Sequence, residues 1–438
     1  MQHTSLVDIA QYVLSETKSK NIDAADVSLS RDEGFSVRVR EGATELVEHH
    51  LNHSLSLTVY DKKRSGNVSI SDFSKASLQS AVEKACSIAK FTQADEFSGL
   101  PDKEFLAFDY PDCDLYHPWD IRPEQAIELA LQCDQAAHDF SKLAATEGSD
   151  VHTYRSAVCV ANSLGFVGEF NKTSHGMSCE VLAKKGKQLQ RDYEFTSSRL
   201  PEKLMDPKWV GKNAAEKAVN RLGAKTLKTQ NRPVLFTPTI AKSIWSSFIA
   251  AISGRNLYRD NSFLNNALNS SVFPKEISIY QDPHLPRFQG SKPFDGEGVR
   301  TKKIQFIENG ILKSYALGSY SGRKLKMPTT GNAGGVFNLF IQGREAGFDE
   351  LLQELGTGLM VTELIGQGVN ILTGDYSRGA FGYWVEKGKI QYPVEEITIA
   401  GNLKTMFQNI IALGDDIDHR GNVHSGSLLI SEMTVAGE

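Results

Sequence analysis

The sequence has no hydrophobic run long enough to cross a bilayer. A membrane-spanning helix needs about 18 or more consecutive apolar residues, and the apolar stretch Ile244–Ile252 is shorter and contains Ser246 and Ser247. The N-terminus, Met1–Asp8, lacks the basic region, apolar region and small-residue cleavage site of a secretory signal. We therefore expect no membrane association and a cytoplasmic location.

Cysteine and excess positive charge are also scarce. The 438 residues include five Cys, an odd number, with no Cys-x-x-Cys, which excludes a disulfide framework and a cysteine zinc site. Free thiols in a reducing compartment are the expected state. There are 48 Lys and Arg against 53 Asp and Glu, a net charge of -5. Since binding to phosphate backbones needs clustered positive charge, nucleic acid is not expected as a ligand.

The common catalytic motifs are missing. The sequence contains no G-x-x-x-x-G-K-[ST], no G-x-S-x-G and no H-E-x-x-H. These patterns encode the phosphate loop of P-loop enzymes, the exposed nucleophile of α/β-hydrolases and the zinc-binding helix of many metalloproteases. Their absence excludes the usual forms of those three classes.

The residues that are present predict an α+β fold with two domains. At 40% hydrophobic and 23% charged, the composition is that of a soluble globular protein. Eleven of the 36 Gly precede residue 225 and 25 follow it, which indicates tighter turns in the second half. We predict an N-terminal α/β domain with an antiparallel sheet, residues 1–224, and a β-rich, Gly-rich C-terminal domain, residues 225–438.

Periodicity predicts the elements of both domains. The N-terminal domain should have helices at 6–17, 74–91, 122–140 and 206–222. It should also have short strands between 35 and 70, ending at Gly34 and Gly42, a second set at 151–198, and a surface loop at Leu100–Pro118. The C-terminal domain should have helices at 238–253, 348–355 and 402–412, and hairpins turning at Asn309-Gly310 and Lys387-Gly388.

Two groups of histidines are candidates for metal binding. His49, His50 and His53 could offer imidazoles to an ion. The alternative, which we favour, is a solvated strand or turn whose neighbouring side chains point to opposite faces. His419 and His424 follow an acidic run. There a surface loop is favoured over a cation site.

Two glycine-rich runs could bind a ligand. The run before Val336–Ile341 contains Gly331, Asn332, Gly334 and Gly335. It could let an extended peptide approach a strand edge, or it could be a flexible connection, and the sequence does not separate the two.

The second run includes Asp375 and Arg378. These two are peptide-binding candidates, although a structural pair is favoured because no nucleophile or base is nearby.

Several stretches of the second half carry a family resemblance. They are Thr362–Asn370, Gly374–Ala380, Tyr392–Leu403 and Ile307–Leu312. Together they resemble the TldD/PmbA family, specifically its PmbA (TldE) branch. The resemblance extends over the whole chain, more weakly in the first domain.

The resemblance implies an α/β first domain, a β-rich second domain and a dimer that encloses a proteolytic cavity. In such dimers a TldD partner carries a His-Glu-x-x-x-His helix and a downstream Cys that hold zinc. Substrates would be small or unfolded peptides, with links to maturation of a peptide antibiotic (microcin) and to antitoxin degradation. An older family label, modulator of DNA gyrase, finds no support in the composition.

This sequence departs from the zinc pattern of the partner. The resemblance places Trp245 and Ser246 at the first His and the Glu, Ala250 at the second His, and Ser278 at the Cys. No His occurs between His175 and His284. A catalytic zinc needs about three protein ligands and a water position, so we expect neither a metal ligand nor a catalytic residue here. The helix at 238–253 should pack as core instead.

The sequence therefore predicts a non-catalytic PmbA/TldE-type subunit of a cytoplasmic TldD–TldE zinc metalloprotease, inactive alone, with zinc in the TldD-like partner. The alternative is a peptide-binding or regulatory homodimer without proteolytic activity. A third hypothesis is a metalloenzyme that assembles distant ligands such as His49, His50 and His53.

Overall fold

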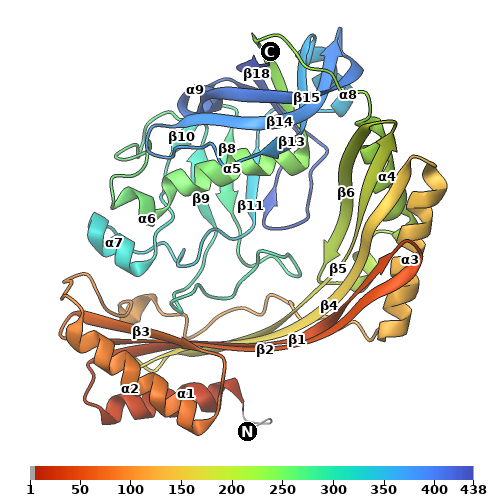
Figure 1. Cartoon of the computed structure of the whole chain (residues 1–438). Helices are drawn as coiled ribbons and strands as arrows, with labels where there is room; N and C mark the ends of the chain where they lie inside the picture. Colours follow the sequence, from red (N-terminus) through yellow and green to blue (C-terminus); the bar gives the residue numbers. More distant parts are fainter. Residues whose placement is uncertain (1–4, 438) are drawn as a thin grey trace.

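The computed structural model describes residues 5–437. It shows a long curved sheet with the β-rich half of the chain on its concave side (Figure 1). The predicted α+β class with an antiparallel N-terminal sheet is confirmed. No helix in the described range is long and apolar enough to span a membrane.

The N-terminal sheet has six antiparallel strands in the order β3-β2-β1-β4-β5-β6. The sequence predicted short strands in two sets. The structure joins both sets into one sheet because β1 pairs along most of its length with β2 on one side and β4 on the other. The strands are β1 (Ala24–Arg40), β2 (Ala43–Asp61), β3 (Arg64–Ile70), β4 (Ala144–Asn162), β5 (Val167–Lys185) and β6 (Gln188–Ser198).

Two pairs of helices cover the two ends of the convex face (Figure 1). Val27 and Leu29 of β1 pack under the first pair, and Val37 and Val39 pack with α3 of the second. The apolar pattern of β1 is interrupted between these points, where no helix formed by residues 5–437 covers the face (Figure 1). The helices are α1 (Leu6–Ser19) and α2 (Lys75–Phe91), then α3 (Pro123–Phe140) and α4 (Pro207–Asn220).

One local prediction in this half was wrong, and a second holds only in part. Gly34 lies inside β1, where an added Cβ would be 2.0 Å from the Thr153 carbonyl oxygen, so the glycine allows close strand packing and does not end the strand. Leu100–Pro118 is not a simple surface loop. Leu106 is buried and forms a β-bridge with Val299 of the second half, and a short 3₁₀ helix covers Lys103–Phe105.

The C-terminal half contains two sheets, with strand orders β10-β9-β8-β11-β17 and β12-β16-β18-β15-β14-β13-β7. The predicted hairpins are present. Asn309 and Gly310 have φ of 48° and 78°, and Lys387 and Gly388 have φ of 49° and 71°, the positive values that tight hairpin turns need. The predicted boundary between residues 224 and 225 falls between α4 and β7 and stays a prediction.

The strands of this half are β7 (Gln230–Phe236), β8 (Ser278–Gln281), β9 (Ile304–Glu308), β10 (Ile311–Leu312), β11 (Leu339–Gln342), β12 (Glu345–Ala346), β13 (Gly358–Ile365), β14 (Asp375–Glu386), β15 (Lys389–Asn402), β16 (Ile410–Gly414), β17 (Val423–His424) and β18 (Leu428–Ala436). The helices are α5 (Pro238–Ile252), α6 (Gly254–Leu257), α7 (Ser319–Leu325), α8 (Phe348–Leu355) and α9 (Leu403–Gln408). The three predicted helices correspond to α5, α8 and a shorter α9.

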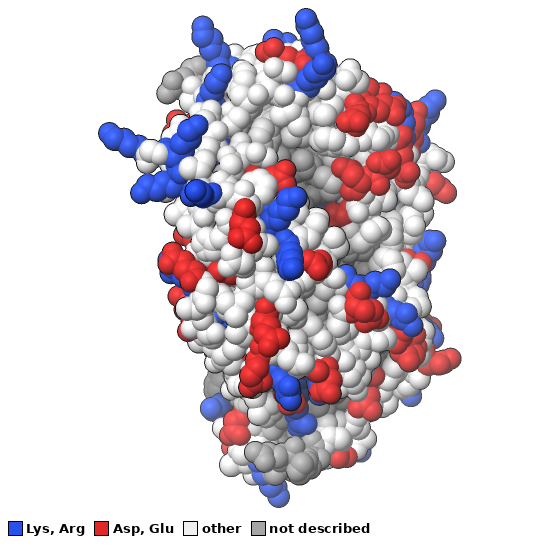
Figure 2. Space-filling model, turned by 90° about the vertical axis from the view of Figure 1, so that its right-hand side faces the viewer, with Lys and Arg blue, Asp and Glu red and all other residues white. Residues whose placement is uncertain are grey.

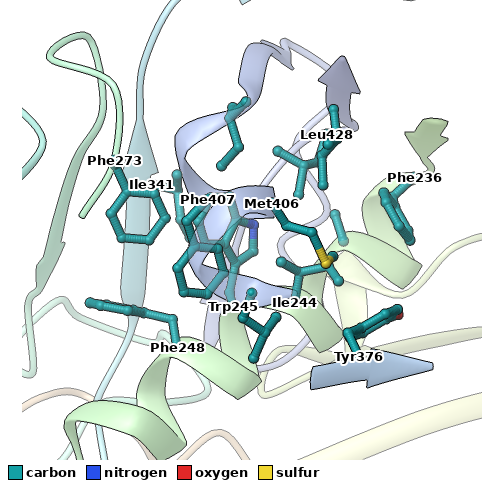
Figure 3. Close-up of a cluster of buried hydrophobic side chains, with 14 of the residues drawn as sticks. Phe236, Ile244, Trp245, Phe248, Phe273, Ile341, Tyr376, Met406, Phe407 and Leu428 are labelled. Carbon is teal, nitrogen blue, oxygen red and sulfur yellow. The ribbon is translucent and has the colours of Figure 1, made fainter. Parts of the chain in front are cut away.

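The largest hydrophobic core lies around α5 (Figure 3). Trp245 and Phe248 of this helix pack against Phe273, which in turn stacks on Phe407 with ring centroids 4.6 Å apart. Each large aromatic side chain removes roughly 150–250 Å² from water. The helix is therefore fixed firmly against both sheets.

The face of the molecule in Figure 2 has a group of Lys and Arg at the upper left, a group of Asp and Glu at the upper right, and both signs mixed in the lower half.

Candidate functional site

Helix α5 turns one face to the core and the other to a cavity. It begins with Pro238 at its first position, where a missing N–H costs nothing. Buried residues recur at helical spacing from there and include Ala241, Ile244, Trp245 and Phe248. Spacings of three and four residues place them on one side of the helix. The remaining side chains therefore face away from the core.

Trp245 belongs to the core side. Its side chain is fully buried, and its indole Nε1–H donates to the Ser425 Oγ at 2.8 Å. The hydrogen bond satisfies the one polar group of the indole, so the ring is a stable packing element (Figure 3).

The opposite side of α5 lines a cavity of about 690 Å³. Ser246 and Ala250 line it together with Asn332, Gly334 and Gly335 of the glycine-rich run. The structure thus brings two groups of sequence-predicted candidates to one place. The volume lies within the range of about 300–1,000 Å³ typical of ligand pockets.

The glycine-rich run is an ordered wall of this cavity. Asn332 is buried. Its Nδ2 donates to the Gln281 Oε1 at 2.8 Å and to the Gly335 carbonyl at 2.9 Å. Gly334 and Gly335 have φ of 96° and 121° with open space where a side chain would project. These glycines leave the backbone uncovered toward the cavity, as close approach of a peptide would require.

Two carboxylates that the sequence analysis missed lie at the same place. Glu297 lines the cavity and accepts from the Ser319 backbone N–H at 2.9 Å. Asp295 is buried behind it and accepts from the backbone N–H of Ala333 at 2.9 Å. Burial, and then the Glu297 charge, raise the pKa of Asp295 to about 7. The sequence signal that could have identified these two carboxylates is a pair of acidic residues inside a glycine-rich turn.

The cavity can bind a ligand, but it contains no activated nucleophile. The Ser246 hydroxyl donates to the Lys242 carbonyl of its own helix at 2.8 Å. No His or Cys of the described residues lines this cavity. The Glu297 carboxylate accepts from the Ser319 N–H and not from Ser246, so Ser246 is not paired with a base that could activate it. The groups it offers are hydroxyls, amides, the Glu297 carboxylate and the Arg255 guanidinium.

Three other candidates lie elsewhere. Ser278 is in β8, where its Oγ accepts from the Asn309 N–H at 3.1 Å. Asp375 accepts from the Thr373 hydroxyl at 2.6 Å, and Arg378 follows in β14 without lining the cavity. Gly331 lies beside the cavity wall, with φ of 71° and an added Cβ only 2.3 Å from the Arg300 carbonyl oxygen.

The histidines near residue 50 do not converge on one point. His49 contacts Phe35, His50 lies 3.2 Å from the Ser36 hydroxyl, and His53 stacks on Phe73. Within residues 5–437, no three His, Cys, Asp or Glu side chains are grouped so that they could hold a metal ion.

His424 is not on a surface loop, contrary to the prediction. It is buried in β17 and stacks on Phe340, with ring centroids 4.6 Å apart.

Comparison with known protein families gives matches over most of the chain. The three PmbA/TldA metallopeptidase domains match in order: domain 1 at residues 25–89, the central domain at 116–222 and the C-terminal domain at 229–437. Metalloprotease PmbA of Escherichia coli O157:H7 is 43% identical over 97% of this chain and 94% of its own length. The chain belongs to the PmbA/TldD family.

Further relatives support the PmbA (TldE) branch. A Metalloprotease PmbA homolog of Haemophilus influenzae is 45% identical over 96% of this chain and 94% of its own length. Among solved structures, a proposed modulator of DNA gyrase from Bacteroides thetaiotaomicron superposes with a TM-score of 0.93 at 25% identity, covering 98% of both chains. TldE from Thermococcus kodakarensis has the same fold, with a TM-score of 0.85 at 20% identity over 98% of this chain and all of its own.

A metallopeptidase family implies a metal ion, and the residues of α5 do not fit one. The Trp245 nitrogen carries a hydrogen that it donates to Ser425, so it has no lone pair to offer. Ala250 presents a methyl group, and Ser246 a hydroxyl bonded to its own helix. Zinc in proteins takes imidazole, thiolate or carboxylate ligands. No catalytic step through a metal follows from these residues.

Proposed function

We propose that this chain is the non-catalytic subunit of a TldD–TldE-type zinc metalloprotease that acts on small or unfolded peptides in the cytoplasm. A TldD-like partner would supply the zinc and the catalytic residues. The observation that carries the proposal is the burial of Trp245 at the position which the family resemblance assigns to a zinc ligand, with its N–H bonded to Ser425.

In this proposal the cavity beside α5 binds part of an extended peptide. The exposed backbone of Gly334 can offer main-chain hydrogen bonds, which do not depend on peptide sequence. The N–H and the carbonyl of Gly335 already bond to Asn332. Glu297 adds a negative charge that favours a peptide amino group or a basic side chain, and Arg255 adds a positive charge that favours a peptide carboxylate. Asp375 and Arg378 are expected to have structural roles at the β14–β15 pair.

The proposal is tested by comparing the chain alone with the chain plus a TldD-like partner. Metal content by mass spectrometry and cleavage of a fluorogenic peptide should both be negative for the purified chain. Activity should appear with the partner and disappear when the Glu of the partner's His-Glu-x-x-x-His is replaced by Gln. Stoichiometric zinc in the isolated chain, or cleavage by it, would contradict the proposal.

A variant of this chain tests the cavity itself. Ala250→Arg extends a long cation into the cavity from a helix position that tolerates Arg. In the assembled complex it should raise the KM for peptide with the complex intact by gel filtration. Ser246→Ala is the matched control, because it removes only a hydroxyl bonded to its own helix. Equal KM values for both variants would reject peptide binding at this cavity.

The second candidate function is a peptide-binding or regulatory homodimer without a protease partner. It is favoured if the chain binds peptide by fluorescence anisotropy with the same affinity when no TldD-like protein is present, and if no complex with such a protein forms.

A further inference from the structure

A second large cavity lies at the seam between the two halves of the chain, and we call it the seam cavity. Its volume is about 880 Å³, within the range of ligand pockets. The end of β6 and the segment leading into α4 form one wall, and residues 286–289, the first turn of α5 and residues 416–420 form the other (Figure 1). Among residues 5–437, none lines both this cavity and the one beside α5.

One part of the seam cavity is apolar and accessible from solvent. Met205, Trp209 and Ile417 line it and are 44%, 38% and 37% exposed. Leu200 and Phe288 add further apolar surface. Large apolar side chains grouped around a concave surface are typical of a ligand-binding site. An apolar group of a ligand would lose its contact with water here.

Arg199 brings a buried positive charge to the wall of the same cavity. Its side chain is only 6% exposed. The Nε, Nη1 and Nη2 atoms donate to the carbonyl oxygens of Phe288, Thr173 and Gln289, which uses three of the five N–H groups of a guanidinium. Burial lowers the pKa of Arg199 to about 10, and no carboxylate of residues 5–437 counters this effect. A buried charge without a counter-charge is costly, so this site favours an anion.

The remaining charges of the seam cavity leave an excess of unpaired cations. Arg287 and Arg420 are each paired with an aspartate. Lys203 is exposed and forms no ion pair within residues 5–437. Asp416 has no cationic partner there, but both of its oxygens accept hydrogen bonds from one serine. Among the Lys, Arg, Asp and Glu that line the cavity, the unpaired charges are therefore two cations, Arg199 and Lys203, and one carboxylate.

We propose that the seam cavity binds a carboxylate that is attached to an apolar group, either the C-terminal residue of a peptide or a small aliphatic acid. Arg199 and Lys203 bind the carboxylate, because hydrogen bonds between charged groups are stronger than neutral ones. The apolar group packs against Met205, Trp209 and Ile417. This inference does not rest on the proposed function, since it needs neither a protease partner nor the cavity beside α5.

The chemistry of the ligand tests the inference on the unmodified full-length chain. N-acetylleucine should bind with a Kd of about 1 mM, as expected for a ligand of this size, in isothermal titration calorimetry. N-acetylleucinamide lacks the negative charge and N-acetylglycine lacks the apolar side chain, so each should bind about tenfold more weakly. Equal affinities for the three compounds, or no saturable binding of N-acetylleucine, would overturn the proposal.

Substitutions of the two cations locate the binding. Arg199→Met should weaken N-acetylleucine binding about tenfold or more. Arg323→Met is its control, because Arg323 also donates to three carbonyl oxygens and does not line the cavity. Equal Kd values for these two variants would give Arg199 a structural role only and overturn the proposal.

A second pair of variants does not depend on the folding of an Arg199 variant. Lys203→Met should raise the Kd for N-acetylleucine about threefold, since an exposed ion pair is weaker than a buried one. Lys208→Met is the matched control, because Lys208 is also exposed and does not line the cavity. An unchanged Kd in Lys203→Met would contradict the proposed carboxylate position.

Trp209 provides a spectroscopic signal from within the site. Binding of N-acetylleucine should change the tryptophan fluorescence of the wild type and of Trp119→Phe, because Trp119 does not line the seam cavity. Trp209→Phe should lose this change. A fluorescence change that persists in Trp209→Phe and disappears in Trp119→Phe would place the ligand elsewhere and overturn the proposal.

A longer ligand distinguishes the two sources of the carboxylate. Acetyl-Gly-Gly-Gly-Leu with a free C-terminus carries the same terminal residue as N-acetylleucine. If it binds at least as tightly, the site accepts peptide C-termini. If it binds more weakly while N-acetylleucine still binds, the site is assigned to a small aliphatic acid. If neither compound binds, the proposal is overturned.

Discussion

His424 and Trp245 both bury a nitrogen-containing ring in the core, but they differ in whether the ring nitrogens are hydrogen-bonded. The Trp245 N–H has Ser425 as its acceptor. Neither ring nitrogen of His424 has a hydrogen-bond partner among residues 5–437, and the ring packs against Phe288 and Phe340. Burial, and then the charge of His419, lower the pKa of His424 to about 4. The neutral imidazole is thus the form that the fold accepts.

This lowered pKa predicts a loss of stability in acid. Unfolded His has a pKa near 6.5, so between pH 6.5 and about 4 the unfolded chain binds a proton that the folded chain does not. The free energy of unfolding should therefore decrease as the pH is lowered. By pH 5 the titration of His424 alone should reduce it by about 2 kcal/mol. His424→Phe keeps the stacked ring and should lose less stability between pH 7 and pH 5 in urea titrations than the wild type.

His419→Asn is the control, because His419 is exposed and is only the second cause of the shift. An acid loss in His424→Phe as large as in the wild type would show that His424 is not the group responsible.

At the scale of elements, the loop at Gly331–Gly335 shows how backbone geometry builds a site. Gly331 permits both a φ of 71° and a close backbone approach, in which an added Cβ would lie only 2.3 Å from the Arg300 carbonyl oxygen. Thr330 and Asn332 next to it are hydrogen-bonded to each other at 2.8 Å. One end of the loop is thereby fixed, and the other end, at Gly334, has open space where a side chain would project.

Alanine substitutions should separate the two ends of this loop. Gly331→Ala combines an unfavourable φ with a backbone clash, and should cost about 2–3 kcal/mol of unfolding free energy. In Gly334→Ala the only unfavourable feature is the φ of 96°, so the substitution should cost about 1 kcal/mol of unfolding free energy. Urea denaturation measures both. Equal losses would contradict the role of the Arg300 contact.

At the scale of the whole molecule, two arginines connect the two halves, Arg199, which is buried, and Arg323, which is half-buried. Arg323 of α7 donates to the carbonyl oxygens of Phe97, Gly99 and Leu100, at 2.7, 2.8 and 3.1 Å. Arg199, at the end of β6, donates to the Phe288 and Gln289 carbonyls. These charged hydrogen bonds are stronger than neutral ones, and they hold irregular segments in place where no strand pairing is available.

Removing the hydrogen bonds of Arg323 should make the 97–100 segment more mobile without unfolding the domains. Arg323→Met keeps most of the apolar stem and loses three hydrogen bonds to the 97–100 segment. Limited proteolysis between residues 92 and 101 should become faster, with the circular dichroism spectrum unchanged. Lys313→Met is the control, since it removes only an exposed ion pair with Glu308. Equal cleavage rates of the two variants would contradict the role of Arg323 in holding this segment.

Local signals gave the elements that depend on neighbouring residues. The first-position Pro238 and the apolar spacing of α5 predicted a core helix, and Asn309-Gly310 and Lys387-Gly388 predicted hairpin turns; all are present. The breaks assigned to β1 were wrong because Gly34 is explained only by Thr153 on the adjacent strand. Asp295 and Glu297 were missed because their place beside α5 depends on contacts distant in sequence.

The sequence by itself determined the family, the fold class and the lack of zinc-type ligands at Trp245, Ser246 and Ala250, because these depend on residue identity and local spacing. Only the tertiary structure decided which candidates share the cavity beside α5, that His424 is buried, and that Arg199 lines the seam cavity. Those properties arise when segments far apart in the chain pack together, and periodicity along one segment contains no information about what will cover it.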